Sequence, residues 1–228
     1  MGCPGALSAM LVAYQVASPV PVTIATEGDY PPYVTVSETG DISGFEKEVA
    51  DDVCLRAALD CTWIFAQFDQ LLPGVMAGTY DIAIGGIAIT EDRLANVDFT
   101  ISYNKAAEDT LYYGRDSAPE PDVGLIGVQS GTIFEMQMQK MGRKYRAYAT
   151  AEAMGDALVA GEVDLVLGAS NLDILQSGEF VSKGSESIPD LGTAMAICKG
   201  NEIKTKIDMA LREMMADGTL DAITNRWF

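Results

Sequence analysis

The sequence predicts an α/β protein of two similar lobes, each a sheet flanked by helices, and three observations support this. Of its 228 residues, 48% are apolar and 21% charged, which is typical of a folded protein with a proper core. Short β-branched runs alternate with amphipathic helical stretches, as in α/β folds. Residues 77–85 (AGTYDIAIG) and 160–168 (AGEVDLVLG) also share one pattern. Each predicts a helix ended by glycine, a turn and a buried strand, so two similar units indicate two similar lobes.

The charge balance and the lack of one residue type exclude several functions. Fifteen Lys and Arg against 33 Asp and Glu give a net charge of −18, so nucleic acid and anionic membrane surfaces are poor partners. The absence of histidine excludes Ser-His-Asp and Cys-His catalysis and histidine-based zinc sites. We therefore expect no nucleic-acid partner, no metal and no cofactor, and an enzyme would have to use carboxylates, lysines or tyrosines.

Residues 1–21 have features of a leader for export. Ala6 to Val16 is an apolar run of the length of a secretory h-region, too short to span a bilayer, and Val16-Ala17-Ser18 is a tolerable cleavage site. A basic n-region is absent, and Pro19 is unfavourable next to a cleavage site. We exclude this segment, with Cys3, from the predicted fold.

The first predicted elements are a strand, a rigid loop and a helix. Val22 to Thr26 is a strand, and the loop that follows it contains the pair Pro31-Pro32, which restricts the backbone. A rigid loop after a parallel strand holds its side chains over the carboxyl edge of the sheet, where α/β proteins bind ligands. Apolar residues at i, i+4 and i+8 from Phe45 then form the buried stripe of a helix.

Two cysteines flank the turn after this helix. Cys54 falls near the helix end, and Cys61 opens the strand Thr62 to Phe65. In an exported chain this pair is well placed for a disulfide, which would stabilise the fold by about 2–3 kcal/mol on a chain-entropy estimate. The alternative is two buried free thiols in a cytosolic core. Cys198 is then unpaired, and we expect it to be buried.

The next segment predicts a small anion site. Asp69 is placed to cap a helix, so that Phe68, just before the helix, can lean over the sheet edge. A strand over 81–84 is followed by two glycines, which let another molecule approach the backbone. Thr90 is placed to cap a further helical turn, and Arg93 would face whatever lies over the strand end.

The second half repeats this organisation. An extended crossover over 111–114 leads into the second lobe, where Gly131 and Thr132 open a helix whose unpaired N–H groups form another anion site. The repeated strand covers 163–168, and residues 169–171 follow at its end. The remaining predicted elements are a strand over 125–128, a helix over 172–176, a loop through Gly184, Ser185 and Pro189, a strand over 194–197, a helix over 202–216 and a short helix that ends at 228.

Eight motifs, in this order and spacing, resemble the polar amino acid-binding family (family 3) of the extracytoplasmic solute-binding proteins of ABC transporters. The resemblance covers 22–228, and the Cys54 to Cys61 spacing is similar to the disulfide of the lysine/arginine/ornithine and histidine binders. The motifs are YPPY (30–33), GF (44–45), FDQLLP (68–73), GTYD (78–81), ITEDR (89–93), VDFT (97–100), GVQSGT (127–132) and the terminal DGT…WF (217–228).

The resemblance implies a two-lobed fold of the type II periplasmic-binding-protein class. Lobe 1 would comprise 22–108 and 191–228, and lobe 2 would comprise 109–190, with hinge crossings near 106–111 and 187–192. Such a protein is periplasmic and is expected to be a monomer. It captures a small polar carboxylate or amino-acid-like solute as the lobes close and works with the membrane permease of an ABC transporter. It is not an enzyme.

The family pattern also implies site residues. The ligand carboxylate would lie on Arg93, helped by the N–H groups of Gly86 and Ile133, because a planar guanidinium can hold both oxygens. Tyr30 and Phe68 would sandwich the body of the ligand. The remaining expected ligand-binding residues are Glu27, which would meet a polar or cationic end of the ligand, and Ala88, Gln129, Gly131, Thr132 and Ser170.

Plainer interpretations of these residues stay open. The two aromatic side chains could belong to the core. Arg93 could form a surface ion pair with Glu91 or Asp98, and Glu27 could be a solvated acid in a loop.

Two positions depart from the family pattern. Ala88 replaces the Ser or Thr that usually donates to the ligand carboxylate, and Ala169 replaces the aspartate that usually holds the α-ammonium. A buried ammonium without a counter-charge costs about 3 kcal/mol or more, and Ser170 and Asn171 offer only neutral hydrogen bonds. We therefore expect a carboxylate without a conventional α-ammonium, or a derivative whose nitrogen meets Glu27.

Two other functions are compatible with such a chain. Cyclohexadienyl dehydratases share the fold, and Glu27, Glu135 or Glu162 could act there as a general acid. The third possibility is the sensor module of a larger signalling protein, which the lack of a membrane span before Phe228 disfavours.

Overall fold

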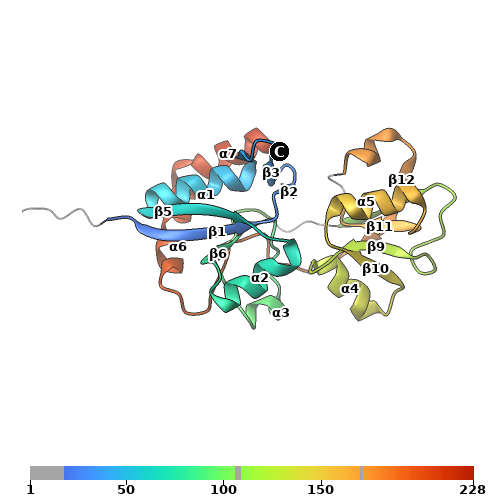
Figure 1. The fold of residues 1–228 in the computed structure, drawn as a ribbon, viewed down its shortest axis with the longest axis horizontal. Helices are drawn as coiled ribbons and strands as arrows, with labels where there is room; N and C mark the ends of the chain where they lie inside the picture. Colours follow the sequence, from blue (N-terminus) through green and yellow to red (C-terminus); the bar gives the residue numbers. More distant parts are fainter. Residues whose placement is uncertain (1–17, 106–108, 170–171) are drawn as a thin grey trace, which may run out of the picture.

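The computed structural model describes residues 18–105, 109–169 and 172–228, and these form the two lobes that the sequence predicts (Figure 1). The strand β1 pairs in parallel with β5 and β6, whereas β13 is antiparallel to β6 and β7. Because β13 comes late in the chain, lobe 1 combines N-terminal and C-terminal segments. Its sheet has the order β5 (Leu59–Phe65), β1 (Val20–Thr26), β6 (Ile82–Ala83), β13 (Ala196–Ile197) and β7 (Asp98–Phe99).

Helices cover both faces of this sheet because neighbouring strand residues point to opposite sides. Val22 and Ile24 of β1 belong to one apolar cluster, and Ala25 belongs to the other. The first face packs against helices that come from both ends of the described chain, and the second packs against α2. The helices of lobe 1 are α1 (Phe45–Arg56), α2 (Phe68–Ala77), the short α3 (Glu91–Leu94), α6 (Ile203–Asp217) and α7 (Thr219–Trp227).

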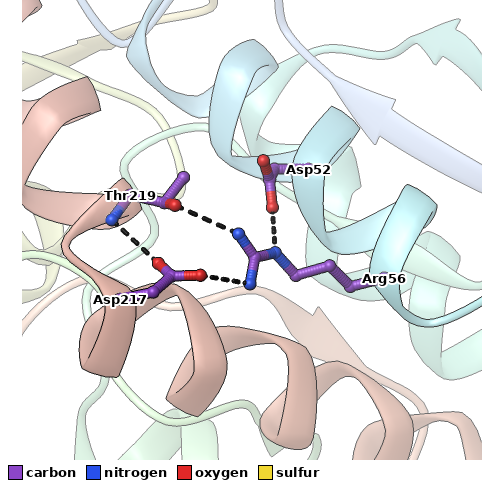
Figure 2. A network of polar contacts seen from close by, with 4 residues as sticks. All are labelled: Asp52, Arg56, Asp217 and Thr219. Atoms are coloured by element: carbon purple, nitrogen blue, oxygen red, sulfur yellow. Dashed lines mark hydrogen bonds and ion pairs between the residues drawn. The ribbon is translucent and has the colours of Figure 1, made fainter.

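A polar network ties the C-terminal helices to α1 (Figure 2). Arg56 contacts Asp52 within α1, donates from Nη1 to Asp217 Oδ2 at 2.7 Å and donates from Nη2 to Thr219 Oγ1 at 3.0 Å. Hydrogen bonds from Thr219 and Arg56 lower the pKa of the Asp217 carboxyl to about 2. The network therefore connects residues 161 positions apart and fixes the junction of α6 and α7 on the N-terminal part of lobe 1.

Lobe 2 has a second five-stranded sheet. The strands β9, β10 and β11 are parallel, and β8 is antiparallel to both β11 and β12. Met138 of α4 packs on one face, and Met154 of α5 packs on the other. The order is β10 (Tyr145–Tyr148), β9 (Ile126–Gln129), β11 (Leu165–Leu167), β8 (Thr110–Arg115) and β12 (Phe180–Glu186), flanked by α4 (Ile133–Met141), α5 (Ala151–Ala160) and the 3₁₀ helix η1 (Asp173–Ser177).

The internal repeat is present in both lobes. The helix α2 ends at Gly78 and α5 ends at Gly161, with φ values of 69° and 72°. These left-handed caps suit glycine, which has no Cβ to clash. The buried strands β6 and β11 follow them, as the shared sequence pattern predicts.

Several local predictions were wrong. The residues Gly184 and Ser185 lie in strand β12 instead of a loop, because pairing with β8 stabilises a segment that is mostly exposed. Phe68 is the first residue of α2 and Asp69 is inside its first turn, since the extended residue before the helix is Gln67. The strand β10 and the small sheet of β2 (Asp29–Tyr30), β3 (Val34–Val36) and β4 (Ile42–Ser43) were not predicted.

The predicted disulfide between Cys54 and Cys61 is present, with a Cα–Cα distance of 6.3 Å. It joins the end of α1 to β5, which begins at Leu59, two residues before the cysteine. Cys198 is half-buried instead of buried. The predicted leader, 1–21, falls largely outside the described residues. It was excluded from the fold, but Val20 and Pro21 belong to β1 because they pair with β5, so this boundary was wrong by two residues. The lobe boundaries near 108 and 190 stay a prediction. Within the described residues no helix is long and apolar enough to cross a membrane.

Candidate functional site

The candidate site is a cavity of about 60 Å³ between the lobes, where strand ends of both sheets meet helix starts. Lobe 1 contributes the residues after β1 and β6 and the start of α2. Lobe 2 contributes the end of β9, the start of α4 and the residue after β11. Nine residues predicted from the sequence line the cavity, namely Glu27, Tyr30, Phe68, Gly86, Ala88, Arg93, Gln129, Thr132 and Ile133.

Arg93 connects the two lobes. Its Nη1 donates to the Ala88 carbonyl at 2.8 Å, and its Nη2 donates to the Gly131 carbonyl at 2.9 Å. The Thr90 hydroxyl caps the short α3 by accepting the Arg93 N–H at 3.3 Å, as the sequence predicts. The side chain is only 5% exposed and makes no ion pair with Glu91 or any other described residue, so the surface ion-pair interpretation is wrong.

Burial lowers the pKa of the Arg93 guanidinium to about 10, and the negative charge of Asp190 acts in the opposite direction. The group is therefore still charged at neutral pH. The described hydrogen-bond partners of this buried cation are neutral carbonyls, so it lacks a counter-charge. A ligand carboxylate in the cavity would supply that negative charge.

Glu27 reaches across the interlobe gap to lobe 2. Gln129 Nε2 donates to Glu27 Oε2 at 2.7 Å, between residues 102 positions apart. Burial raises the pKa of the Glu27 carboxyl to about 7, although the bond from Gln129 lowers it. The side chain is therefore not a solvated loop acid, and it is part of a polar contact that closes the site.

The role expected for the Gly86 amide differs from its contacts in the structure. This N–H donates to both carboxylate oxygens of Glu46, at 3.0 and 2.9 Å, so it is already occupied. Glu46 lies in the first turn of α1, is fully buried and also accepts the Tyr103 hydroxyl at 2.6 Å. Burial raises the pKa of Glu46 to about 7. Glu46 thus positions the loop under the cavity, a role that no local sequence pattern indicates.

Aromatic side chains form the walls of the cavity. Tyr30 stacks on Tyr33 with ring centres 5.0 Å apart and planes 18° apart, and Phe68 lies 6.0 Å from the Arg93 guanidinium carbon. Tyr30 and Phe68 are half-buried and line the cavity, and Phe68 also packs against an apolar cluster of lobe 1. Phe134 of lobe 2 is a third aromatic wall.

Sequence analysis missed three lining residues, Gly85, Phe134 and Gly168. Phe134 follows the predicted site residue Ile133 in the first turn of α4, so its position next to Ile133 could have identified it as a lining residue. A Cβ at Gly168 would lie 2.2 Å from the Phe134 ring, so glycine at the end of β11 makes room for this aromatic wall.

The remaining predicted residues fall in different places. Gly131 is outside the cavity wall and contributes its carbonyl to Arg93. Ser170 lies outside the described residues. Ala169 is fully buried in the apolar cluster of lobe 2 with Met154 and Phe180, so it gives the cavity no charged group. Among the described residues no cluster of three Cys, Asp or Glu side chains could hold a metal ion.

The lobes are in contact at the site. A Cβ at Gly131 in lobe 2 would lie 2.7 Å from the Asp69 Cα in lobe 1, so only glycine permits this approach. Together with the Arg93 and Glu27 bonds, this contact indicates a closed arrangement.

Comparisons with known proteins agree with this geometry. A family model for bacterial extracellular solute-binding proteins, family 3, matches residues 22–228. The lysine/arginine/ornithine-binding periplasmic protein of Escherichia coli (strain K12) is 27% identical over 232 residues, covering 93% of this chain and 89% of that protein.

Solved structures show the same likeness. A periplasmic His/Glu/Gln/Arg/opine family-binding protein from Silicibacter pomeroyi, in complex with lysine, has a TM-score of 0.83 and 31% identity, covering 91% of this chain and 96% of that one. An ancestral amino acid-binding protein described as a precursor of cyclohexadienyl dehydratase has a TM-score of 0.76, covering 91% of this chain and 95% of that one. At 24% identity, this likeness shows only that the two proteins share a fold.

Proposed function

The chain belongs to family 3 of the bacterial extracellular solute-binding proteins, and we propose that it captures a small polar carboxylate or amino-acid-like solute between its lobes. It does so in the periplasm and delivers the solute to the membrane permease of an ABC transporter. The relatives that support this proposal are amino acid-binding periplasmic proteins.

The observation that carries the proposal is the position of Arg93. It is a buried cation on lobe 1 that reaches the start of α4 on lobe 2, across a cavity with aromatic walls. At the start of α4, Glu135 accepts the Gly131 N–H and the Thr132 hydroxyl accepts the Glu135 N–H. A carboxylate that binds the Arg93 guanidinium and the intervening N–H groups of Ile133 and Phe134 would contact both lobes at once. Such a ligand favours the closed state because an open form cannot offer both sets of contacts.

The ligand is expected to lack a conventional α-ammonium, or to place its nitrogen on another acid. Ala88 offers no hydroxyl to the carboxylate, and the apolar surroundings of Ala169 offer no counter-charge. Isothermal titration calorimetry against the twenty amino acids and a set of simple carboxylates tests both the proposed function and the expected ligand class. Binding of a carboxylate that R93A abolishes would support the function, and binding of none would contradict it. Sub-micromolar binding of an ordinary amino acid would contradict only the ligand class.

We also propose that the protein is a receptor and not an enzyme. Of the three candidate acids, Glu135 accepts the Gly131 N–H at 2.8 Å, and Glu162 pairs with Arg146 at an exposed position. Only Glu27 faces the cavity. Assays for aromatic acids formed from prephenate or arogenate should give no product, and turnover that depends on Glu27 would favour the dehydratase instead.

A further inference from the structure

A second, larger cavity adjoins the candidate site on the hinge side. It has a volume of about 410 Å³ and shares five wall residues with the smaller cavity, namely Tyr30, Gly86, Ala88, Ile133 and Phe134. We call it the hinge chamber. Its other walls include Tyr33 and Phe228 of lobe 1 and residues near the expected hinge crossings. The charged residues among these walls are Lys105, Asp109 and Asp190.

Ala88 places only a methyl group between the two cavities on lobe 1. The neighbouring Gly86 is covered by the Tyr30 ring, which would lie 2.6 Å from a Cβ built there, so the passage runs over Ala88. Ala88 is held in place by an antiparallel bridge to Thr193, and Thr193 is bridged in turn to Asn104. A molecule bound at Arg93 therefore has room to extend over Ala88 into the hinge chamber, along a backbone that is fixed by hydrogen bonds.

Asp190 supplies negative charge inside the hinge chamber. Its Oδ1 accepts the Gly192 N–H at 2.7 Å, which fixes the carboxylate, and its Oδ2 has no hydrogen bond to any described residue. The carboxylate lies near enough to Arg93 and Tyr33 for its charge to raise the pKa of both groups. Asn104 donates to the Tyr33 hydroxyl at 2.9 Å, so these neighbouring polar groups are satisfied while Asp190 Oδ2 is open.

Glu27 is a weaker counter-charge than Asp190 for a cationic nitrogen. One of its oxygens is engaged by Gln129, and burial raises its pKa to about 7, so a large fraction of this carboxyl is protonated at neutral pH. Ala169, at the position where the family usually has an aspartate for the ligand nitrogen, has no charge. Two acids, Asp109 and Asp190, line the hinge chamber with Ala88, and the charge of Asp190 also acts on Arg93.

We propose that the ligand extends from Arg93 over Ala88 into the hinge chamber, where Asp190 binds its basic nitrogen. The ligand class is then a zwitterion whose carboxylate and nitrogen are separated by a short chain, such as an ω-amino acid, instead of an α-amino acid. This proposal rests on the proposed function, because it assumes that the ligand carboxylate lies on Arg93.

Isomer pairs test this directly, because they differ only in where the nitrogen lies. The probes are 4-aminobutanoate against 2-aminobutanoate and 5-aminopentanoate against 2-aminopentanoate, titrated calorimetrically into the full chain. We expect at least one ω-amino isomer to bind about tenfold or more tightly than its α-amino partner, since the counter-charge is at Asp190. Equal affinities, or tighter binding of the α-amino isomers, would overturn the proposal.

Three variants separate Asp190 from general charge effects. Asp190→Asn keeps an oxygen for the Gly192 N–H and should abolish the preference for the ω-amino isomer. Asp60→Asn, at an exposed position on β5, makes the same change in net charge and should leave the preference intact. Ala88→Leu should block the passage and weaken the ω-amino isomers most. An unchanged preference in Asp190→Asn would assign the nitrogen elsewhere and refute the proposal.

The outcomes also distinguish this proposal from the proposed function. If simple carboxylates bind through Arg93 but no ω-amino isomer is preferred, the function stands and the role of Asp190 fails. If no carboxylate, amino acid or isomer binds at millimolar concentration, the proposed function fails as well.

Discussion

Arg93 is the residue on which ligand binding is expected to depend most. Its planar fork donates to carbonyls of both lobes and leaves other N–H groups for a ligand carboxylate. We predict that Arg93→Lys, which keeps the charge but loses the fork, lowers the affinity for the bound carboxylate by about 10- to 100-fold, or about 1.5–3 kcal/mol. Isothermal titration would measure this.

The matched control for this change is Arg212→Lys on the exposed face of α6, where the affinity should stay the same. An Arg93→Lys protein that binds as tightly as the parent would show that the guanidinium geometry does not matter.

Two buried carboxyls should make stability depend on pH. Burial raises the pKa values of Glu27 and Glu46 from 4.5 to about 7, so the folded state disfavours their charged forms. The contribution of these two carboxyls to the free energy of unfolding is complete below about pH 4.5, where both are protonated. It is lost as the pH rises through about 7, and each group then lowers the free energy of unfolding by about 3 kcal/mol. We predict that Glu46→Gln reduces the difference in the free energy of unfolding between pH 5 and pH 8. Urea denaturation of the ligand-free protein at the two pH values would measure this.

Glu213→Gln, an exposed acid on α6, serves as the control and should keep the slope of the parent protein. The prediction fails if the parent gains stability between pH 5 and pH 8, or if Glu46→Gln has the same slope as the parent.

At the scale of elements, the disulfide fixes the turn between α1 and β5. Cys54 and Cys61 are separated by seven positions, and closing so short a loop gives about 2.5 kcal/mol on the chain-entropy estimate. We predict that replacing both cysteines by serine lowers the free energy of unfolding by about this amount. The control is Cys198→Ser, which leaves the disulfide intact and should lose little of the free energy of unfolding when no reductant is present. A double variant as stable as the parent would contradict the estimate.

At the scale of the whole molecule, Gly131 determines whether the lobes can close. A Cβ there would meet the Asp69 backbone of the opposite lobe at 2.7 Å, and its φ of 76° adds local strain. We predict that Gly131→Ala lowers ligand affinity by about tenfold or more, because the closed state is lost while each lobe still folds. Calorimetry and the radius of gyration with and without ligand would measure this.

Gly142 at the other end of α4 is the matched control. Its φ of 65° imposes similar strain, but nothing lies within 4 Å of a Cβ built there. Gly142→Ala should therefore cost some stability and leave the affinity unchanged. Equal affinities of the two variants would show that contact between the lobes does not limit binding.

The sequence by itself determined the features that depend on neighbouring residues. The repeated unit and the Thr90 cap could be predicted because strand ends, glycine caps and capping hydroxyls are encoded within a few positions. The resemblance to the family, which is carried by motifs along the sequence, added the nine lining residues and supported the disulfide.

Only the tertiary structure decided which groups meet across the chain. The Gly86 amide binds Glu46, 40 positions away, and Glu27 meets Gln129, 102 positions away. The exposed strand β12 likewise forms because β8 is beside it. No local pattern reports these contacts, because the burial and the partner of a polar group are set by how distant segments pack, and the same packing makes Gly131 a contact between the lobes.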